Sequence, residues 1–254
     1  MNSVSFYTKT STRKKRSAYE GLYDTRNTHN FIKSVLLSTF VTKGSTVLDL
    51  GCGKGGDVKK LEILEIGSYI GIDNCKKVLE LCQERLSKTS IPNYTVLENT
   101  MWDFTYIDCD VISCQFSLHY GFEDETKADA TINNISKCLK KGGIFLGTIP
   151  FYKTCFEKSI VNIPGTTLTL EEPTVNKKEL ERITEKYNFK QILWKPFLEY
   201  YKEIYKKNEE LVMSYILQKF KDKALIIISH DLNVLKNCDY VIQLNGNKIE
   251  KKEF

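Results

Sequence analysis

Apolar and polar positions along the chain follow two periods, one typical of strands and one typical of helices. Short apolar runs bounded by Gly, Asp or Pro predict five buried strands, at residues 45–51, 68–73, 94–99, 109–116 and 144–150. Helical spacing predicts helices at residues 30–40, 55–67, 75–88 and 125–143. Because strand and helix alternate with short connections, we expect a doubly wound α/β fold with a parallel sheet between helices.

Polar and Gly residues stand at the carboxyl ends of these predicted strands. They are Gly51, Asp73, Asn99 and Gln115. In doubly wound sheets, ligands bind beyond the carboxyl ends of the strands, at the switch in strand order. The four residues are therefore expected to meet at one site.

The stretch VLDLGCGKGGDVKK, residues 47–60, contains a Gly-rich turn between a strand and a helix. Lys54 lies inside the glycines and no Ser or Thr follows it, which disfavours a phosphate-binding P-loop. Gly51, Gly53 and Gly56 only approximate the dinucleotide fingerprint. A plain strand-to-helix turn is the alternative interpretation.

Two acidic residues favour one class of cofactor for this turn. Asp49 lies at the end of the first strand, and Asp73 ends the second, where an acid suits a pair of ribose hydroxyls. S-adenosylmethionine carries an adenosine and a sulfonium cation but no phosphate. It therefore fits a site framed by carboxylates better than a site built to attract anions.

Composition narrows the class of protein. The 254 residues, 41% of them hydrophobic, suffice for one well-buried core. The chain lacks an apolar run of ~18 residues and an apolar signal segment at its start, so we expect neither membrane insertion nor export. The eight cysteines form no C-x-x-C pair, which favours neither zinc nor disulfides. The net charge of +5 and the basic run at residues 13–16 suit either a polyanionic partner or a solvated tail.

Five segments carry a family resemblance: NFIKSVLL, VLDLGCGKGGDVKK, CDVISCQFSLHYGFEDE, LKKGGIFLGTIP, and the run from LEEPTVNKKELER to YKKNEE at residues 170–210. Together they resemble the eukaryotic mRNA cap guanine-N7 methyltransferases, over roughly residues 5–220. The resemblance implies a Rossmann-like class I methyltransferase with a mostly parallel, seven-stranded sheet. It also implies methyl transfer from S-adenosylmethionine to N7 of the 5′ guanosine cap of RNA.

The resemblance further implies roles for individual residues. Those expected to hold the methyl donor are Lys33, Gly51, Gly53, Asp57, Asp73, Asn99, Gln115 and Tyr120. Those expected to face the cap are His29, Asn30, Lys54, Lys60, Arg85, His119 and Glu172. Guanine N7 has a lone pair and no proton, so no general base is required, and His119, Tyr120 and Glu172 are expected to position the reactants. Phe116 and Tyr120 are candidates for stacking on a purine.

Several alternatives stay open for these residues. Asp103 is an alternative to Asn99 at the adenine, and Glu171 is an alternative to Glu172 at the cap. Lys54, Lys60 and Arg85 also suit a solvated helical face, and His119 also suits a structural core histidine. No metal site is predicted.

The chain departs from the family in two places. The segment between Pro150 and Glu172 is short, and no terminal strand with a cap-binding aromatic residue is recognisable after Phe220. A degenerate methyltransferase-like RNA-binding or scaffold protein, or a methyltransferase for another RNA or a small molecule, is therefore the alternative function.

The expected organisation has three parts: a basic and partly disordered segment at residues 1–27, a methyltransferase domain at 28–223, and an atypical segment at 224–254. The last segment resembles the end of an ABC-transporter ATPase domain, with His230 at the switch position, but the chain lacks a Walker A motif. A strand, helix and hairpin that complete the sheet, a fusion scar and a partner-binding unit are the three explanations, of which we favour the first.

The partners and location follow from the resemblance. The expected partner is the capped 5′ end of RNA, with other capping enzymes or the RNA polymerase II machinery as further candidates and no membrane partner. We expect a monomer in the nucleus, with the cytoplasm as the alternative location.

Overall fold

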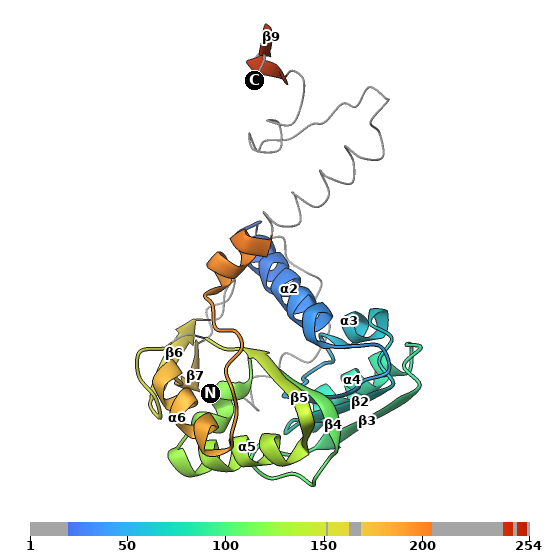
Figure 1. Cartoon of the computed structure of the whole chain (residues 1–254), viewed down its shortest axis with the longest axis vertical. Coiled ribbons are helices and arrows are strands. Elements are labelled where there is room, and N and C mark those ends of the chain that lie inside the picture. Colours follow the sequence, from blue (N-terminus) through green and yellow to red (C-terminus); the bar gives the residue numbers. More distant parts are fainter. Residues whose placement is uncertain (1–19, 151, 163–168, 205–240, 246–247, 253–254) are drawn as a thin grey trace. The chain divides into compact units, whose positions relative to one another are not determined.

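A computed structural model describes residues 20–150, 152–162, 169–204, 241–245 and 248–252 (Figure 1). The chain divides into two units, Met1–Trp194 and Lys195–Phe254. Within the described residues, no helix is long and apolar enough to cross a membrane.

The first unit is built on a five-stranded parallel sheet in the order β3-β2-β1-β4-β5. Its strands are β1 (Thr46–Leu50), β2 (Ser68–Asp73), β3 (Asn93–Glu98), β4 (Cys109–Gln115) and β5 (Leu139–Thr148). The five predicted strands are therefore confirmed. The strand order reverses between β1 and β4, so ligands of this fold bind beside the end of β1. The predicted total of seven strands stays a prediction.

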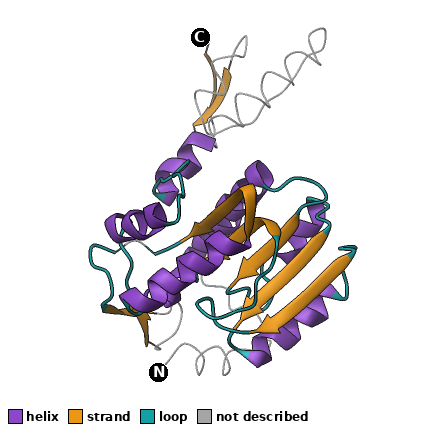
Figure 2. Ribbon diagram, turned by 60° about the horizontal axis from the view of Figure 1, so that its bottom comes forward, coloured by secondary structure: helices purple, strands orange, loops and turns teal. Residues whose placement is uncertain are grey.

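Helices cover both faces of this sheet (Figure 2). Apolar residues of α2 (Glu20–Phe40), α3 (Val58–Ile63) and α4 (Lys76–Leu86) pack on one face, against Val47 and Tyr69. Apolar residues of α5 (Glu125–Cys138) and α6 (Lys177–Lys186) pack on the other face, against Leu48 and Leu50. Because side chains alternate along a strand, β1 supplies both cores and turns Asp49 toward α2, α3 and α4.

Three predicted boundaries are wrong. The helix predicted to end at Gly67 ends at Ile63, because Glu65 adopts a left-handed conformation with φ of 54°. The helix predicted for residues 125–143 ends at Cys138, because Leu139 is already extended and pairs with Cys109 of β4. Strand β5 consequently begins five residues earlier than predicted. Helix α2 begins at Glu20, before the predicted start at residue 30. The predicted division of the chain at residue 27 stays a prediction.

Three smaller elements also belong to the first unit. The 3₁₀ helix η1 (Leu118–Phe122) follows β4, and β6 (Lys158–Asn162) pairs with β7 (Thr169–Pro173) in a separate antiparallel sheet.

Six of the seven described cysteines are buried, all seven are free thiols, and the described residues hold no metal-binding group of His, Cys, Asp and Glu.

In the second unit, β8 (Val241–Asn245) and β9 (Lys248–Lys252) form an antiparallel hairpin, as the NGN turn predicts. The two strands make a two-stranded sheet of their own. The predicted boundary at residue 223, the predicted strand at 224–229 and His230 lie outside the described residues. The prediction that this segment completes the main sheet stays a prediction.

Candidate functional site

The Gly-rich turn leaves the end of β1 through left-handed backbone. Gly51, Gly53 and Gly55 have φ of 69°, 52° and 69°, which favour glycine. A Cβ at Gly51 would lie 2.4 Å from Ser117 Cβ, whereas a Cβ at Gly53 would meet nothing within 4 Å. Gly51 is therefore required by packing, and Gly53 leaves open space above the turn.

Asp73, at the end of β2, holds this turn in place. One carboxylate oxygen accepts a hydrogen bond from Gly53 N at 2.9 Å, and the other accepts one from Cys75 N at 3.0 Å. Burial raises the pKa of Asp73, and hydrogen bonds from backbone N–H groups partly oppose the shift. Asn99 N donates to the carbonyl of Asp73 at 3.1 Å, whereas Asp103 is exposed. The structure thus brings the Asn99 backbone to Asp73, and the choice between Asn99 and Asp103 at the adenine stays a prediction.

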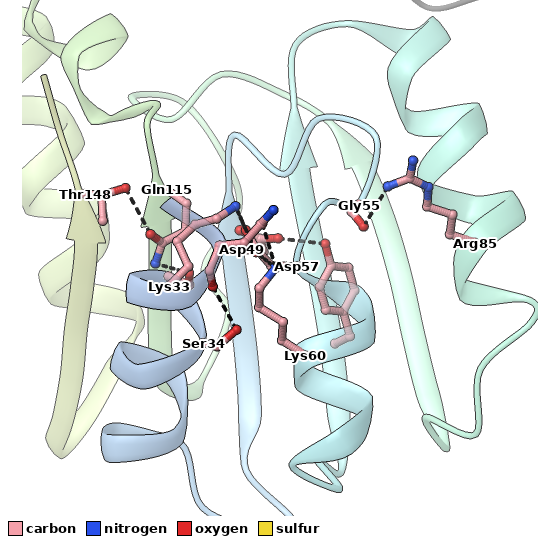
Figure 3. Close-up of polar contacts among 12 residues, drawn as sticks. Lys33, Ser34, Asp49, Gly55, Asp57, Lys60, Arg85, Gln115 and Thr148 are labelled. Atoms are coloured by element: carbon pink, nitrogen blue, oxygen red, sulfur yellow. Dashed lines mark hydrogen bonds and ion pairs between the residues drawn. The ribbon is translucent and has the colours of Figure 1, made fainter. Parts of the chain in front are cut away.

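A polar network joins α2 to the start of α3 (Figure 3). Lys33 Nζ lies 2.9 Å from Asp57, and Lys60 Nζ lies 2.8 Å from the same carboxylate. Lys60 also donates to Asn30 Oδ1 at 3.3 Å. Asp57 is buried, so the two ammonium groups balance its charge. This network places two predicted donor residues beside two predicted cap residues.

Asp49 lies in β1 below this network and is only 3% exposed. The Tyr69 hydroxyl donates a hydrogen bond to Asp49 Oδ2 at 2.9 Å. Burial and the neighbouring Asp57 carboxylate raise the pKa of Asp49 to about 7, although the Tyr69 hydrogen bond and the charge of Lys33 oppose the shift. The sequence indicated Asp49 as an acid of the turn, but it gave no sign of the contact with Tyr69. We call Asn30, Lys33, Asp49, Gly53, Asp57, Lys60 and Asp73 the turn cluster.

Strand β4 ends beside the turn. Gln115 is fixed by Ser113 and Thr148, which lie 3.1 and 3.0 Å from its side-chain amide atoms. Phe116 is left-handed, with φ of 56°, and its ring lies 4.8 Å from the ring of His29 on α2. Burial and the nearby charge of Lys33 lower the pKa of His29. The predicted residues Gln115 and His29 thus both lie at the carboxyl end of β4, Gln115 as its last residue and His29 through its contact with Phe116.

A second group consists of His119, Tyr120 and Glu172, which we call the Glu172 cluster. The Tyr120 hydroxyl donates to Glu172 Oε1 at 2.7 Å. His119 Nε2 lies 3.5 Å from Glu172 Oε2, too far for a good hydrogen bond, and neither ring nitrogen makes a hydrogen bond among the described residues. His119 is 1% exposed, so the ring is a buried polar group with bonding capacity to spare.

The alternation of β7 separates the two candidate carboxylates. Glu171 is exposed, whereas Glu172 is buried beside Tyr120. Burial raises the pKa of Glu172, but the contacts from His119 and Tyr120 outweigh burial and hold this pKa below its usual value. Glu172 is therefore an ionised, oriented carboxylate at neutral pH.

Lys54 and Arg85 lie on the α4 side of the Gly-rich turn. Arg85 is exposed and donates to the carbonyl of Gly55 at 3.2 Å. Burial and the charge of Arg85 lower the pKa of Lys54. These cations are thus neighbours of the turn, and the solvated-face interpretation still applies to Arg85.

The sequence model of the mRNA (guanine-N(7))-methyltransferase domain matches residues 4–167, more than half of the chain. The chain belongs to this family. The family resemblance is thereby confirmed, whereas the ABC-transporter resemblance gains no support from the comparisons.

Curated mRNA cap guanine-N(7) methyltransferases are similar to this family member. The protein from Eremothecium gossypii is 39% identical over 145 residues, which cover 52% of this chain and 34% of that one. The protein from Saccharomyces cerevisiae is 38% identical over 138 residues, covering 49% and 32%. The mRNA cap guanine-N(7) methyltransferase 1 from Oryza sativa is 36% identical over 137 residues, which cover 48% of this chain and 37% of that one. The match thus spans about a third of the length of these relatives.

Two solved structures show the same fold at low identity. The DhpI–SAH complex is 13% identical, with a TM-score of 0.53, and covers 72% of this chain and 84% of that one. Streptomyces venezuelae DesVI is also 13% identical, with a TM-score of 0.51, and covers 69% and 92%. The Rossmann-like class I methyltransferase fold is therefore confirmed.

Proposed function

We propose that this chain transfers a methyl group from S-adenosylmethionine to N7 of the guanosine cap of RNA. The observation that carries the proposal is the Glu172 cluster: an ionised carboxylate beside a buried histidine with unused bonding capacity. An acceptor carboxylate and a ring nitrogen suit a polar planar ligand. The family of the chain supports guanine as that ligand.

The turn cluster fits a cationic nucleoside donor. Gly53 leaves open space above the turn, and the carboxylates of Asp49 and Asp73, which make no ion pair among the described residues, favour positive charge nearby. Asp73 lies at the end of β2, where an acid suits ribose hydroxyls. When bound, S-adenosylmethionine supplies a methyl group on a sulfonium. Lys33, Gly51, Gln115, Tyr120 and the Asn99 backbone are the further residues proposed to hold it.

The proposed work of the chain is alignment and charge stabilisation. The N7 lone pair must lie in line with the methyl carbon and its leaving group, and such positioning contributes ~7–11 kcal/mol. Guanine gains positive charge as its N7 is methylated. The Glu172 carboxylate would favour that charge, and Tyr120 and His119 would hold the carboxylate in place. Lys54, Lys60 and Arg85 are proposed to neutralise the cap phosphates, and His29 and Asn30 to face the cap.

The test is methyl transfer from radiolabelled donor to GpppA, GTP and uncapped RNA. We expect label on GpppA alone. Label on uncapped RNA would favour a methyltransferase for another RNA, and donor binding without turnover would favour a degenerate scaffold protein. As the matched control, Glu171→Gln alters the exposed neighbour and should leave turnover unchanged.

The proposed partner is the capped 5′ end of RNA. Other capping enzymes and the RNA polymerase II machinery are further candidates, and the monomer is the proposed oligomeric state. The nucleus is the proposed location, because caps are added as RNA is made, and the cytoplasm is the alternative.

A further inference from the structure

A buried tyrosine without a predicted role reaches the donor side of the site. Tyr69 lies in β2, is 0% exposed, and donates its hydroxyl to Asp49 at 2.9 Å. The same hydroxyl lies 3.8 Å from Cys82 Sγ of α4. A fully buried phenol aimed at a buried carboxylate is a specific polar pair, because either group alone would be costly to bury.

Strand register explains how the ring reaches Asp49. Asp49 pairs with Gly71, and Tyr69 lies two residues earlier in β2, on the same face of the sheet. A Cβ at Gly71 would lie 3.0 Å from the Tyr69 ring and 2.9 Å from Cys52 Sγ. The absent side chain at Gly71 therefore makes room for the tyrosine ring beside the carboxylate.

The surroundings of Asp49 oppose its ionisation from nearly every side. Burial disfavours the charge, and the carboxylates of Asp57 and Asp73 repel it, while Lys33 on α2 attracts it. The groups that face Asp49 are Lys33 from α2, Asp57 at the start of α3, Tyr69 and Asp73 from β2, Cys52 from the turn, Cys82 from α4 and Cys114 from β4. Among them, Tyr69 supplies the direct hydrogen bond that favours the charged carboxylate.

We propose that Tyr69 is a positioning residue of the donor site: its hydroxyl, 2.9 Å from Asp49 Oδ2, holds this carboxylate in place beside the Gly-rich turn, where its negative charge favours a cationic donor. The inference rests on the proposed function, because it concerns the affinity for S-adenosylmethionine. Tyr69 acts through Asp49, since it is fully buried. The donor carries a permanent sulfonium charge, whereas the product S-adenosylhomocysteine is a neutral thioether. Tyr69 should therefore matter more for the donor than for the product.

The test compares the binding of donor and product by wild type and Tyr69→Phe at pH 7 and pH 8.5. Loss of a hydrogen bond to a charged group is expected to raise the pKa of Asp49 by about one unit. If the donor requires the charged form, Tyr69→Phe should bind it about fivefold more weakly at pH 7 and nearly normally at pH 8.5. Affinity for S-adenosylhomocysteine should change less than twofold at either pH.

The matched control is Tyr94→Phe. Tyr94 of β3 is the register partner of Tyr69, and its hydroxyl makes no hydrogen bond within the described residues. This variant should behave as wild type at both pH values. Asp49→Asn tests the route, because Tyr69→Phe should add no pH-dependent change in that background.

Three results would overturn the inference. One is an equal effect of Tyr69→Phe at both pH values, and another is an equal effect on donor and product. Should Tyr69→Phe fail to fold, wild type alone decides: its preference for donor over product must fall as the pH drops below about 7, and a constant preference sinks the idea. Absence of donor binding by wild type would instead overturn the proposed function, and this inference with it.

Discussion

The turn cluster and the Glu172 cluster are held by different kinds of structure. The turn cluster is held by the main sheet, because Asp73 ends β2 and accepts hydrogen bonds from the backbone N–H groups of Gly53 and Cys75. Glu172 belongs instead to β7, which among the described residues pairs only with β6. The comparison indicates that the geometry of the turn cluster is set by the core of the fold. The Glu172 cluster depends on a smaller accessory sheet, which can change while the core stays.

The largest expected effect is a loss of stability from a steric clash in the Gly-rich turn, which carries part of the turn cluster. Gly51→Ala places a Cβ 2.4 Å from Ser117 Cβ at a residue with φ of 69°. We expect a loss of roughly 3–5 kcal/mol in the free energy of unfolding, measured by chemical denaturation. Gly53→Ala is the control, because the same substitution meets open space and should cost about 1–2 kcal/mol. Similar losses for the two variants would contradict the packing account.

The next effect concerns donor affinity. Asp73→Ala removes the acceptor of two backbone hydrogen bonds and the proposed ribose contact. We expect donor affinity to fall about 100-fold by isothermal titration calorimetry, equivalent to ~3 kcal/mol. The exposed Asp108, which has no predicted role at the donor, gives the matched control, since Asp108→Ala should leave affinity within twofold of wild type. Unchanged binding by Asp73→Ala would remove this residue from the donor site.

A smaller effect separates the two clusters directly. Glu172→Gln keeps the size of the side chain but removes its charge, so methyl transfer to GpppA should slow about 30-fold, or ~2 kcal/mol. Donor affinity should change less than twofold, because the turn cluster is attached to a different sheet and the amide oxygen of the substituted side chain can still accept the hydrogen bond from Tyr120, the proposed donor residue of this cluster. A loss of donor affinity as large as the loss of methyl transfer would mean that the turn cluster and the Glu172 cluster are not held independently.

The smallest effect is a pH dependence at α2. Burial and Lys33 lower the pKa of His29 below its ordinary value of 6.5, so the unfolded chain binds more protons than the folded chain as the pH falls through that region. Stability conferred by neutral His29 is therefore present above pH 6.5 and declines below it. His29→Phe should reduce this acid loss by well under 1 kcal/mol, about 1 °C in Tm, because the ring is partly solvated. An unchanged difference in Tm between pH 7.5 and 5.5 would contradict the assignment.

The sequence predicted the elements that depend on local pattern. Each of the five strands is a short apolar run ended by Gly, Asp or another polar residue, and the parallel order follows from helices between them. The predicted end of α5 was wrong because Gly142 suggested the end of a helix, and only the pairing of Leu139 with Cys109 across the sheet makes Leu139 a strand residue. Such pairing depends on tertiary context.

The site was predictable to a similar depth. Gly51 and Asp73 are recognisable because they end strands, whereas the choice of Glu172 over Glu171 depended on the register of β7, which the structure supplies. The contact between Tyr69 and Asp49 could not be predicted, because it requires the relative register of β1 and β2. Period-two alternation gives the face of each residue but not its neighbour on the next strand.

Three consecutive residues at the end of β4 point to three different elements. Gln115 contacts Thr148 of β5, the ring of Phe116 contacts His29 of α2, and the Ser117 hydroxyl donates to the Leu50 carbonyl of β1. The left-handed backbone conformation of Phe116 allows the three side chains to point in different directions. Because these three contacts come from consecutive residues, a shift of β5, α2 or β1 would move the other two contacts as well. A substitution in β5, far from the reacting atoms, would therefore still displace the residues at the end of β4.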